Sequence, residues 1–226
     1  IEQTQRLKTG MMQKLLTSGI GHKKFKKTKI GEIPEEWELY HMGEIVKFVG
    51  GSQPPKNTFV TKPKDGYIRL LQIRDYKTDG YPTYIPKKLA RRFCTPDDIM
   101  IGRYGPPIFQ ILRGKTGSYN VALMKAVPGK KINNEYLYNI LKQEILLNLI
   151  ISVSDRTAGQ AGIDILVLKN FLVGVPSLPE QKQITSILSN VDTQIQKEKL
   201  HKSNLERLKK GLMQKLLTGQ IRVKVR

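Results

Sequence analysis

The sequence has little cysteine, few acidic residues and no long apolar run. Cys94 is the only cysteine among 226 residues, so no disulfide can form within the chain and a disulfide-stapled secreted domain is excluded. No apolar run approaches the ~20 residues that span a bilayer, so we expect no contact with membrane. The chain opens at Ile1 with neither an initiator Met nor a secretory apolar segment, which favours a fragment or a processed product. We expect a protein of the reducing cytoplasm.

Acidic residues are scarce relative to basic ones. The chain has 39 Lys and Arg against 19 Asp and Glu, which gives a formal net charge of +20. An excess of this size is typical of a surface that binds a polyanion, and we favour nucleic acid because the cations recur inside the globular part. Solubility, or an acidic partner protein, is the alternative explanation of the same charge.

Catalytic motifs are also missing. The run Gly114–Thr116 imitates the end of a phosphate-binding P-loop, but Phe109 stands where that loop needs a glycine. The sequence brings together no nucleophile, base and orienting group. We therefore expect a chain that recognises a ligand rather than an enzyme, with no metal and no cofactor of its own. The three histidines, which lie far apart, are His22, His41 and His201.

One phrase is present twice. Residues 6–17, RLKTGMMQKLLT, return 201 positions later as RLKKGLMQKLLT at residues 207–218. An offset this long corresponds to a domain plus its helix and not to a solenoid repeat. In the first copy Leu7, Met11 or Met12, and Leu15 have helical spacing. We interpret the chain as the tail of one helix, a complete globular unit and a second helix.

Five segments are predicted: residues 1–20, the end of a helix; 21–29, a basic linker; 30–178, the globular unit; 179–218, a long helix; and 219–226, a basic tail. Short apolar runs alternate with turn residues inside the unit, which is typical of strands. Residues 133–151 instead have a helical pattern, with Asn133 or Asn134 as the cap. The fold class is therefore α+β, with a β-rich domain followed by a long coiled-coil-forming helix. The candidate strands lie at residues 44–49, 67–73, 99–101, 108–112 and 121–127.

The long helix carries an apolar seam that requires a partner helix. About 40 residues make a helix of ~60 Å, which cannot bury its whole face on a domain of ~150 residues. We expect the partner to come from a missing half or from a second copy of the chain. The predicted pairing residues are Ile184, Leu188, Val191, Ile195, Leu205, Leu208, Leu212 and Leu216.

Four stretches resemble the specificity subunit of type I restriction–modification enzymes. They are IGEIPEEW at residues 30–37, GGSQPP at 50–55, VPSLPEQKQI at 175–184, and the duplicated MQKLLT phrase. An opening like Pro-Leu-Pro-Glu-Gln ahead of a long helix, here Pro-Ser-Leu-Pro-Glu-Gln, is quite specific to that family. Its members have two target-recognition domains, each reading one half of a split DNA site, separated by long conserved helices. This chain resembles the second half, or a half-length form with one such domain and the distal helix.

The resemblance implies that the chain binds double-stranded DNA without catalysing a reaction. Methylation would belong to modification subunits and cleavage to a translocating restriction subunit; these partners would use S-adenosylmethionine, ATP and Mg²⁺. The long helix would pair with the other half of the specificity subunit or, in a homodimer, with a second copy. Two other readings stay open, namely the specificity portion of a single-chain restriction–methylation enzyme and a helical scaffold with incidental charge.

Loops beside the predicted strands are the expected carriers of DNA contacts. Lys and Arg would supply sequence-independent affinity through counterion release, and Arg, Gln or Asn would read base edges. Each candidate also has an ordinary explanation as a solvated charge, a core residue or part of a turn. The candidates are Ser52, Gln53, Lys56, Arg74, Asp75, Tyr76, Lys77, Arg103, Tyr104, Arg113, Lys115, Ser118, Asn120, Arg156, Thr157 and Gln160.

Overall fold

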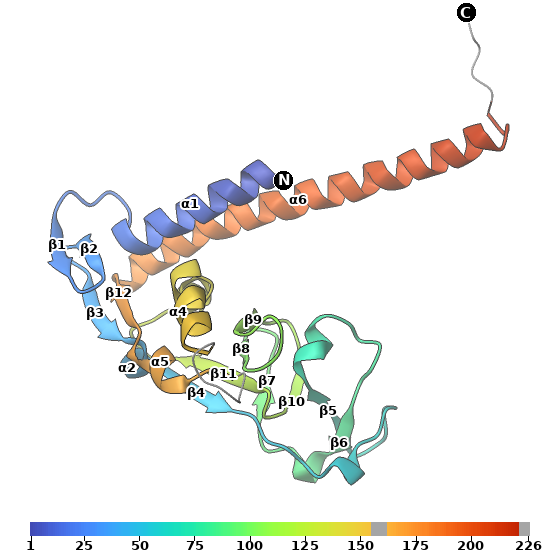
Figure 1. The fold of residues 1–226 in the computed structure, drawn as a ribbon, viewed down its shortest axis with the longest axis horizontal. Coiled ribbons are helices and arrows are strands. Elements are labelled where there is room, and N and C mark those ends of the chain that lie inside the picture. Colours follow the sequence, from blue (N-terminus) through green and yellow to red (C-terminus); the bar gives the residue numbers. More distant parts are fainter. Residues whose placement is uncertain (155–161, 222–226) are drawn as a thin grey trace, which may run out of the picture.

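A computed structural model describes residues 1–154 and 162–221 of the chain. Helix α1 (Glu2–Ser18) lies alongside the first half of helix α6 (Leu178–Leu217), and the globular domain adjoins the end where α6 begins (Figure 1). The second half of α6 extends beyond α1 and away from the domain (Figure 1). The predicted α+β fold, with a long helix after the domain and a helix end before it, is confirmed.

The segment predicted as a basic linker contains a strand. β1 (Phe25–Thr28) pairs antiparallel with β2 (Gly31–Pro34), so the prediction of a linker over residues 21–29 was wrong. Thr28 closes the turn: its hydroxyl donates to the Gly31 carbonyl at 2.7 Å and accepts from the Ile30 amide at 3.3 Å. Gly31 has φ 101°, a left-handed conformation that favours glycine. The lysine run concealed this hairpin because a four-residue strand has too few positions to show an apolar alternation.

A four-stranded antiparallel sheet forms the centre of the domain. Its order is β4 (Val46–Gly50), β11 (Leu123–Pro128), β8 (Ile99–Gly102) and β9 (Gln110–Leu112). These strands correspond to four predicted ones with shifted ends.

The first of them begins later than predicted because Glu44 belongs to a short helix, α2 (Met42–Ile45). The Glu44 carboxylate accepts a hydrogen bond from the His41 amide at 2.6 Å and thereby caps that helix. Immediately before it, β3 (Glu38–His41) pairs with β12 (Leu172–Val175), which leads directly into α6.

A second four-stranded sheet builds what we call the small lobe, defined as residues 52–98 and 113–120. Its order is β6 (Tyr84–Pro86), β5 (Tyr67–Leu71), β10 (Gly117–Tyr119) and β7 (Phe93–Cys94), and only β5 and β10 run parallel. The strand predicted at 67–73 stops at Leu71. Three 3₁₀ turns connect the strands: η1 (Lys56–Thr58), η2 (Ile73–Tyr76) and η3 (Lys87–Leu89).

The helix predicted over residues 133–151 is two helices, α3 (Asn134–Leu141) and α4 (Glu144–Ser154). The predicted cap is confirmed, since the Asn133 side chain accepts from the amides of Glu135 and Tyr136. The chain changes direction at residues 142–143, without a glycine or proline to signal it. A further short helix, α5 (Ile165–Asn170), precedes β12.

Trp37, the only tryptophan, lies in the main hydrophobic core and is 1% exposed. A Cβ on Gly174 of β12 would lie 3.0 Å from the Trp37 ring, so glycine permits this close packing. The core continues through α3 and α4 to the buried Leu16 of α1 and to Ile184 and Leu188 of α6. The small lobe has a second hydrophobic cluster that it shares with the central sheet, formed by Leu71, Cys94 and Tyr119 with Met100 of β8 and Leu123 of β11.

The two halves of α6 differ in what covers them. Ile184, Leu188 and Ile195 are buried and Val191 is half-buried, in agreement with their predicted pairing role. Their partner includes α1 of the same chain, running antiparallel; the expectation that the partner must come from outside was wrong for this half. The other four predicted pairing residues are exposed in the described structure: Leu205, Leu208, Leu212 and Leu216.

Candidate nucleic-acid interface

The PSLPEQ segment at residues 176–181, where α6 begins, forms the joint between the helices and the domain. Glu180 accepts hydrogen bonds from the Ile20 amide at 3.1 Å and from the Trp37 indole at 3.1 Å, and its carboxylate lies 2.8 Å from His22 Nε2. One carboxylate therefore ties together the end of α1, the segment after it and the core tryptophan. The His22 ring meets the Trp37 ring edge-on, with centroids 6.4 Å apart.

The next residue, Gln181, joins two segments, the residues before α3 and the residue after β12. It is fully buried, accepts from the Asn133 amide at 2.7 Å, and donates to the carbonyls of Lys131 and Pro176 at 2.9 Å each. A buried amide with donors and acceptor satisfied fixes its surroundings, because losing any partner leaves a polar group desolvated. The domain and α6 are therefore held in one geometry by adjacent side chains. In the sequence this segment indicated a helix start and the family resemblance, but not the contacts of Glu180 and Gln181.

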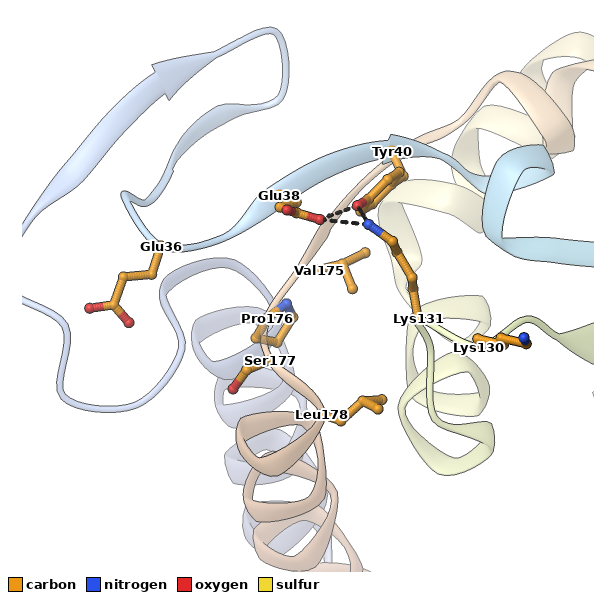
Figure 2. A pocket seen from close by; sticks show the side chains of 9 residues that line it. All are labelled: Glu36, Glu38, Tyr40, Lys130, Lys131, Val175, Pro176, Ser177 and Leu178. Carbon is orange, nitrogen blue, oxygen red and sulfur yellow. Dashed lines mark hydrogen bonds and ion pairs between the residues drawn. The ribbon is translucent and has the colours of Figure 1, made fainter.

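A shallow pocket of about 360 Å³ lies beside this joint (Figure 2). Figure 2 shows Glu38, Tyr40 and Lys131 pointing toward one another at its rim. The Tyr40 hydroxyl and the Lys131 amine, the latter at 3.1 Å, both donate to the Glu38 carboxylate and hold the pKa of Glu38 below its usual value. Hydrogen bonds of the Lys131 amine to Tyr40 and to Glu38 raise the pKa of Lys131. The charges of Glu38 and Lys131 therefore neutralise each other, and the lining also includes Glu36 and Lys130.

The small lobe concentrates positive charge. Residues 52–94 hold ten Lys and Arg against three Asp. Many of these cations are exposed and form no salt bridge within the described part of the chain, namely Lys56, Lys62, Lys77, Lys87, Lys88, Arg91 and Arg92. The lobe therefore presents unneutralised positive charge on its turns and connecting segments.

A network of ion pairs connects two of the predicted DNA-contacting groups. Arg69 of β5 binds Asp75 at 2.9 Å and Asp79 at 2.7 Å, and Asp79 also binds Lys115 at 2.6 Å. Lys115 and Arg69 hold the pKa of Asp79 below its usual value. The structure thus places the segment after β5 next to the segment before β10, which are about 40 residues apart in sequence.

Some predicted residues have exposed side chains and stay candidates for DNA contact. Those that are exposed are Gln53, Lys56, Arg74, Lys77 and Tyr104.

Others are occupied by contacts within the chain. Arg113 donates to the Glu135 carboxylate at 2.9 Å and stacks 3.8 Å above the Tyr138 ring, so it supports α3. Arg103 donates to the Val121 carbonyl at 3.4 Å and Asn120 accepts from the Ala122 amide at 3.1 Å.

Two predicted residues are buried, which corrects their assignment. Asp75 is 1% exposed: it accepts from the Gln72 amide at 2.6 Å and from Arg69, and so caps η2. Ser118 is fully buried in β10. Neither side chain has the accessible surface that contact with a duplex requires. Their polarity suggested a DNA contact, and only the tertiary structure shows that both side chains are buried.

Ser52 and Tyr76 are half-buried, and burial raises the pKa of the Tyr76 phenol. Tyr76 packs against the core cluster of the small lobe. The last three candidates, Arg156, Thr157 and Gln160, lie outside the described residues.

Sequence analysis missed several exposed residues of the small lobe. Two pairs of adjacent basic residues, Lys87-Lys88 and Arg91-Arg92, lie between β6 and β7 and were visible in the sequence. Tyr81, between η2 and β6, is 72% exposed. Its exposure could not be predicted, because a tyrosine in a loop can be either buried or exposed.

Within residues 1–154 and 162–221, no group of three or more His, Cys, Asp or Glu side chains is placed to hold a metal ion. None of the helices described in the structure is long and apolar enough to cross a membrane.

The chain belongs to the family of type I restriction modification DNA specificity domains, whose family model matches residues 34–207. This confirms the resemblance found in the sequence. The protein assigned as the type I restriction enzyme MjaX specificity subunit of Methanocaldococcus jannaschii is 32% identical over 99% of this chain. The MjaVIII specificity subunit of the same organism is 29% identical over 99%. The chain spans about half the length of these relatives, 53% and 56%.

Solved structures of the same family share the fold. The HsdS subunit from Thermoanaerobacter tengcongensis is similar over 95% of this chain and 50% of its own, with a TM-score of 0.66 and 19% sequence identity. The S subunit of the type I restriction–modification system from M. genitalium is similar over 95% of this chain and 54% of its own, with a TM-score of 0.59 and 15% identity.

Proposed function

We propose that this chain is a non-catalytic DNA-recognition part of a type I restriction–modification system and that it reads one half of a bipartite site in double-stranded DNA. The observation that carries the proposal is the set of unpaired cations on the small lobe, a lobe whose domain is fixed to α6 through Glu180 and Gln181. Family membership supports it. Methylation and cleavage are then the work of modification and restriction subunits, which would supply S-adenosylmethionine, ATP and Mg²⁺ chemistry in the cytoplasm.

A pair of charge-matched variants tests where DNA binds. In the first, Lys87, Lys88, Arg91 and Arg92 of the small lobe are changed to Ala. In the second, Lys199, Lys209, Lys210 and Lys215 of α6 are changed to Ala, which removes the same formal charge from another exposed surface.

We expect the lobe variant to bind duplex DNA more weakly, because phosphate contacts are lost. The slope of log K against log salt should become shallower by about 0.9 for each phosphate contact removed. The α6 variant should keep the wild-type slope. Fluorescence anisotropy at several salt concentrations measures both. Equal losses in the two variants would favour a scaffold with incidental charge instead.

We further propose that the exposed end of α6 pairs with a helix similar to the first half of α6, from the other half of a specificity subunit or from a second copy. The support is the repeated phrase, since its first copy packs against such a helix within this chain. By the offset of 201, Leu216 corresponds to the half-buried Leu15 and Leu208 to Leu7, which is 57% exposed.

A synthetic peptide spanning residues 178–199 is the probe for this pairing. Binding of the peptide to the full chain should be lost in Leu216→Asp and kept in Leu208→Asp, as measured by sedimentation equilibrium. Identical behaviour of the two variants would rule out the correspondence with α1.

A further inference from the structure

Tyr81 is unusually exposed for an aromatic residue. Its ring is 72% exposed, and among the large apolar and aromatic side chains of the described residues only Leu217 is more exposed. Single exposed apolar residues are ordinary on protein surfaces, so exposure alone indicates nothing. What distinguishes Tyr81 is how its loop is held.

The loop is anchored on both sides of Tyr81. On one side Asp79 is bound by Arg69 at 2.7 Å and by Lys115 at 2.6 Å. On the other side the buried Thr83 accepts hydrogen bonds from Gln72 at 3.1 Å and Arg74 at 3.3 Å. Each anchor is two residues from Tyr81, so the chain between them has little freedom.

The backbone of the loop is fixed as well. The Thr78 amide donates to the Arg74 carbonyl at 3.2 Å, and the Gly80 amide donates to the Thr78 hydroxyl at 3.1 Å. The Leu70 amide of β5 donates to the Thr83 carbonyl at 2.8 Å. A ring presented by such a loop loses little conformational entropy on binding, which is the property of an aromatic anchor at an interface.

The charges around the loop suit a polyanion. Asp79 is neutralised by two cations and Asp75 is buried in its pair with Arg69, so neither carboxylate repels a phosphate from the surface. Arg74 and Lys77 are exposed nearby in sequence. An aromatic ring with free cations beside it can combine contact to bases with contact to the backbone.

We propose that Tyr81 is a specificity-determining residue whose ring contacts the bases of the recognised half-site, and that Asp79 is a positioning residue that holds its loop. The inference rests on the proposed DNA-recognition function. It assigns base contact to a residue on the loop between η2 and β6.

The test begins with a library of duplexes with a randomised centre, from which the full wild-type chain selects its preferred sequence. Affinities for the selected duplex and for a scrambled duplex are then compared among variants. Tyr81→Ala removes the ring and Tyr81→Phe keeps it. Phe25→Ala is the matched control, because Phe25 is an exposed aromatic of β1, 42% exposed, in a separate part of the fold (Figure 1).

We expect Tyr81→Ala to lower affinity for the selected duplex roughly tenfold, the scale of one lost base contact, with scrambled-duplex affinity and the salt slope unchanged. Tyr81→Phe and Phe25→Ala should behave as wild type, and all variants should melt at the wild-type temperature. Asp79→Asn should reduce discrimination and also raise affinity for the scrambled duplex, because it frees Lys115 while Arg69 stays paired with Asp75.

Equal losses on both duplexes, or no loss on either, would overturn the assignment of Tyr81 while leaving DNA recognition intact. A library from which the wild-type chain selects no sequence would overturn the proposed function together with it.

Discussion

The two copies of the repeated phrase have nearly the same sequence and opposite environments. Residues 6–17 form the part of α1 that packs against α6 and the domain, whereas residues 207–218 lie at the end of α6, away from α1 and from the domain (Figure 1). Leu16 is 4% exposed and Leu217, its equivalent, is 83% exposed. The phrase therefore encodes a helix with an apolar stripe, and the partner alone decides whether that stripe is buried.

Polar positions show the same contrast. Lys8 forms an ion pair with Asp192 of α6 at 2.5 Å, while its equivalent, Lys209, forms none with the residues that the structure describes. Both helices are followed by a glycine with positive φ, 64° at Gly19 and 71° at Gly219. A Cβ on Gly19 would lie 2.4 Å from the Glu180 carboxylate and 2.8 Å from the Trp37 ring; one on Gly219 would meet nothing within 4 Å.

The largest effect should come from truncating the buried leucine. Leu16→Ala should lower the free energy of unfolding by about 2–5 kcal/mol, because it leaves a cavity in the main core. Leu217→Ala should change it by less than about 0.5 kcal/mol. Urea unfolding of both variants measures the difference. A large loss in Leu217→Ala would mean that the end of α6 is already buried in solution.

A smaller difference should separate the two glycines. Gly219→Ala should lose only about 1–2 kcal/mol, the strain of a left-handed alanine. Gly19→Ala should lose a further ~1–3 kcal/mol, since the joint around Glu180 must shift to admit a methyl group. Thermal unfolding compares the two. Equal losses would show that the joint accommodates the methyl group without distortion.

The smallest effect should come from the lysines. Lys8→Ala should lower the free energy of unfolding by about 0.5–1 kcal/mol, because Asp192 is half exposed and its pair is partly screened. The loss should shrink in high salt, and Lys209→Ala should have no measurable effect. A loss in Lys8→Ala that persists in high salt would point to packing of the lysine stem instead of charge.

The prediction of the fold succeeded where local patterns are long. The helix α6 was predicted to within one residue at each end, because an apolar pattern with heptad-like spacing over about 40 residues identifies a helix. The hairpin at β1 and β2 and the break between α3 and α4 were missed. Each depends on a few residues, whose conformation is set by pairing and packing and not by their own periodicity.

The prediction of the site was less complete. Charge composition pointed to the globular part as a whole, and the candidate groups after β5 and before β10 lie together around Asp79. Residue type could not separate the buried Asp75 and Ser118 from the exposed Lys77. Burial depends on neighbours that are distant in sequence, so polar loop residues stay ambiguous until the chain is folded.

The sequence by itself determined the family, the order of helix, domain and helix, and the excess of positive charge, because motifs, periodicity and composition are local properties of the chain. Only the tertiary structure decided that α1 covers half of the α6 stripe and leaves the other half bare. It also decided that Glu180 and Gln181 lock the domain to the helix and that Tyr81 projects from an anchored loop. These features arise from contacts between segments distant in sequence, such as that of Thr4 with Glu198, 194 residues apart, which no local pattern records.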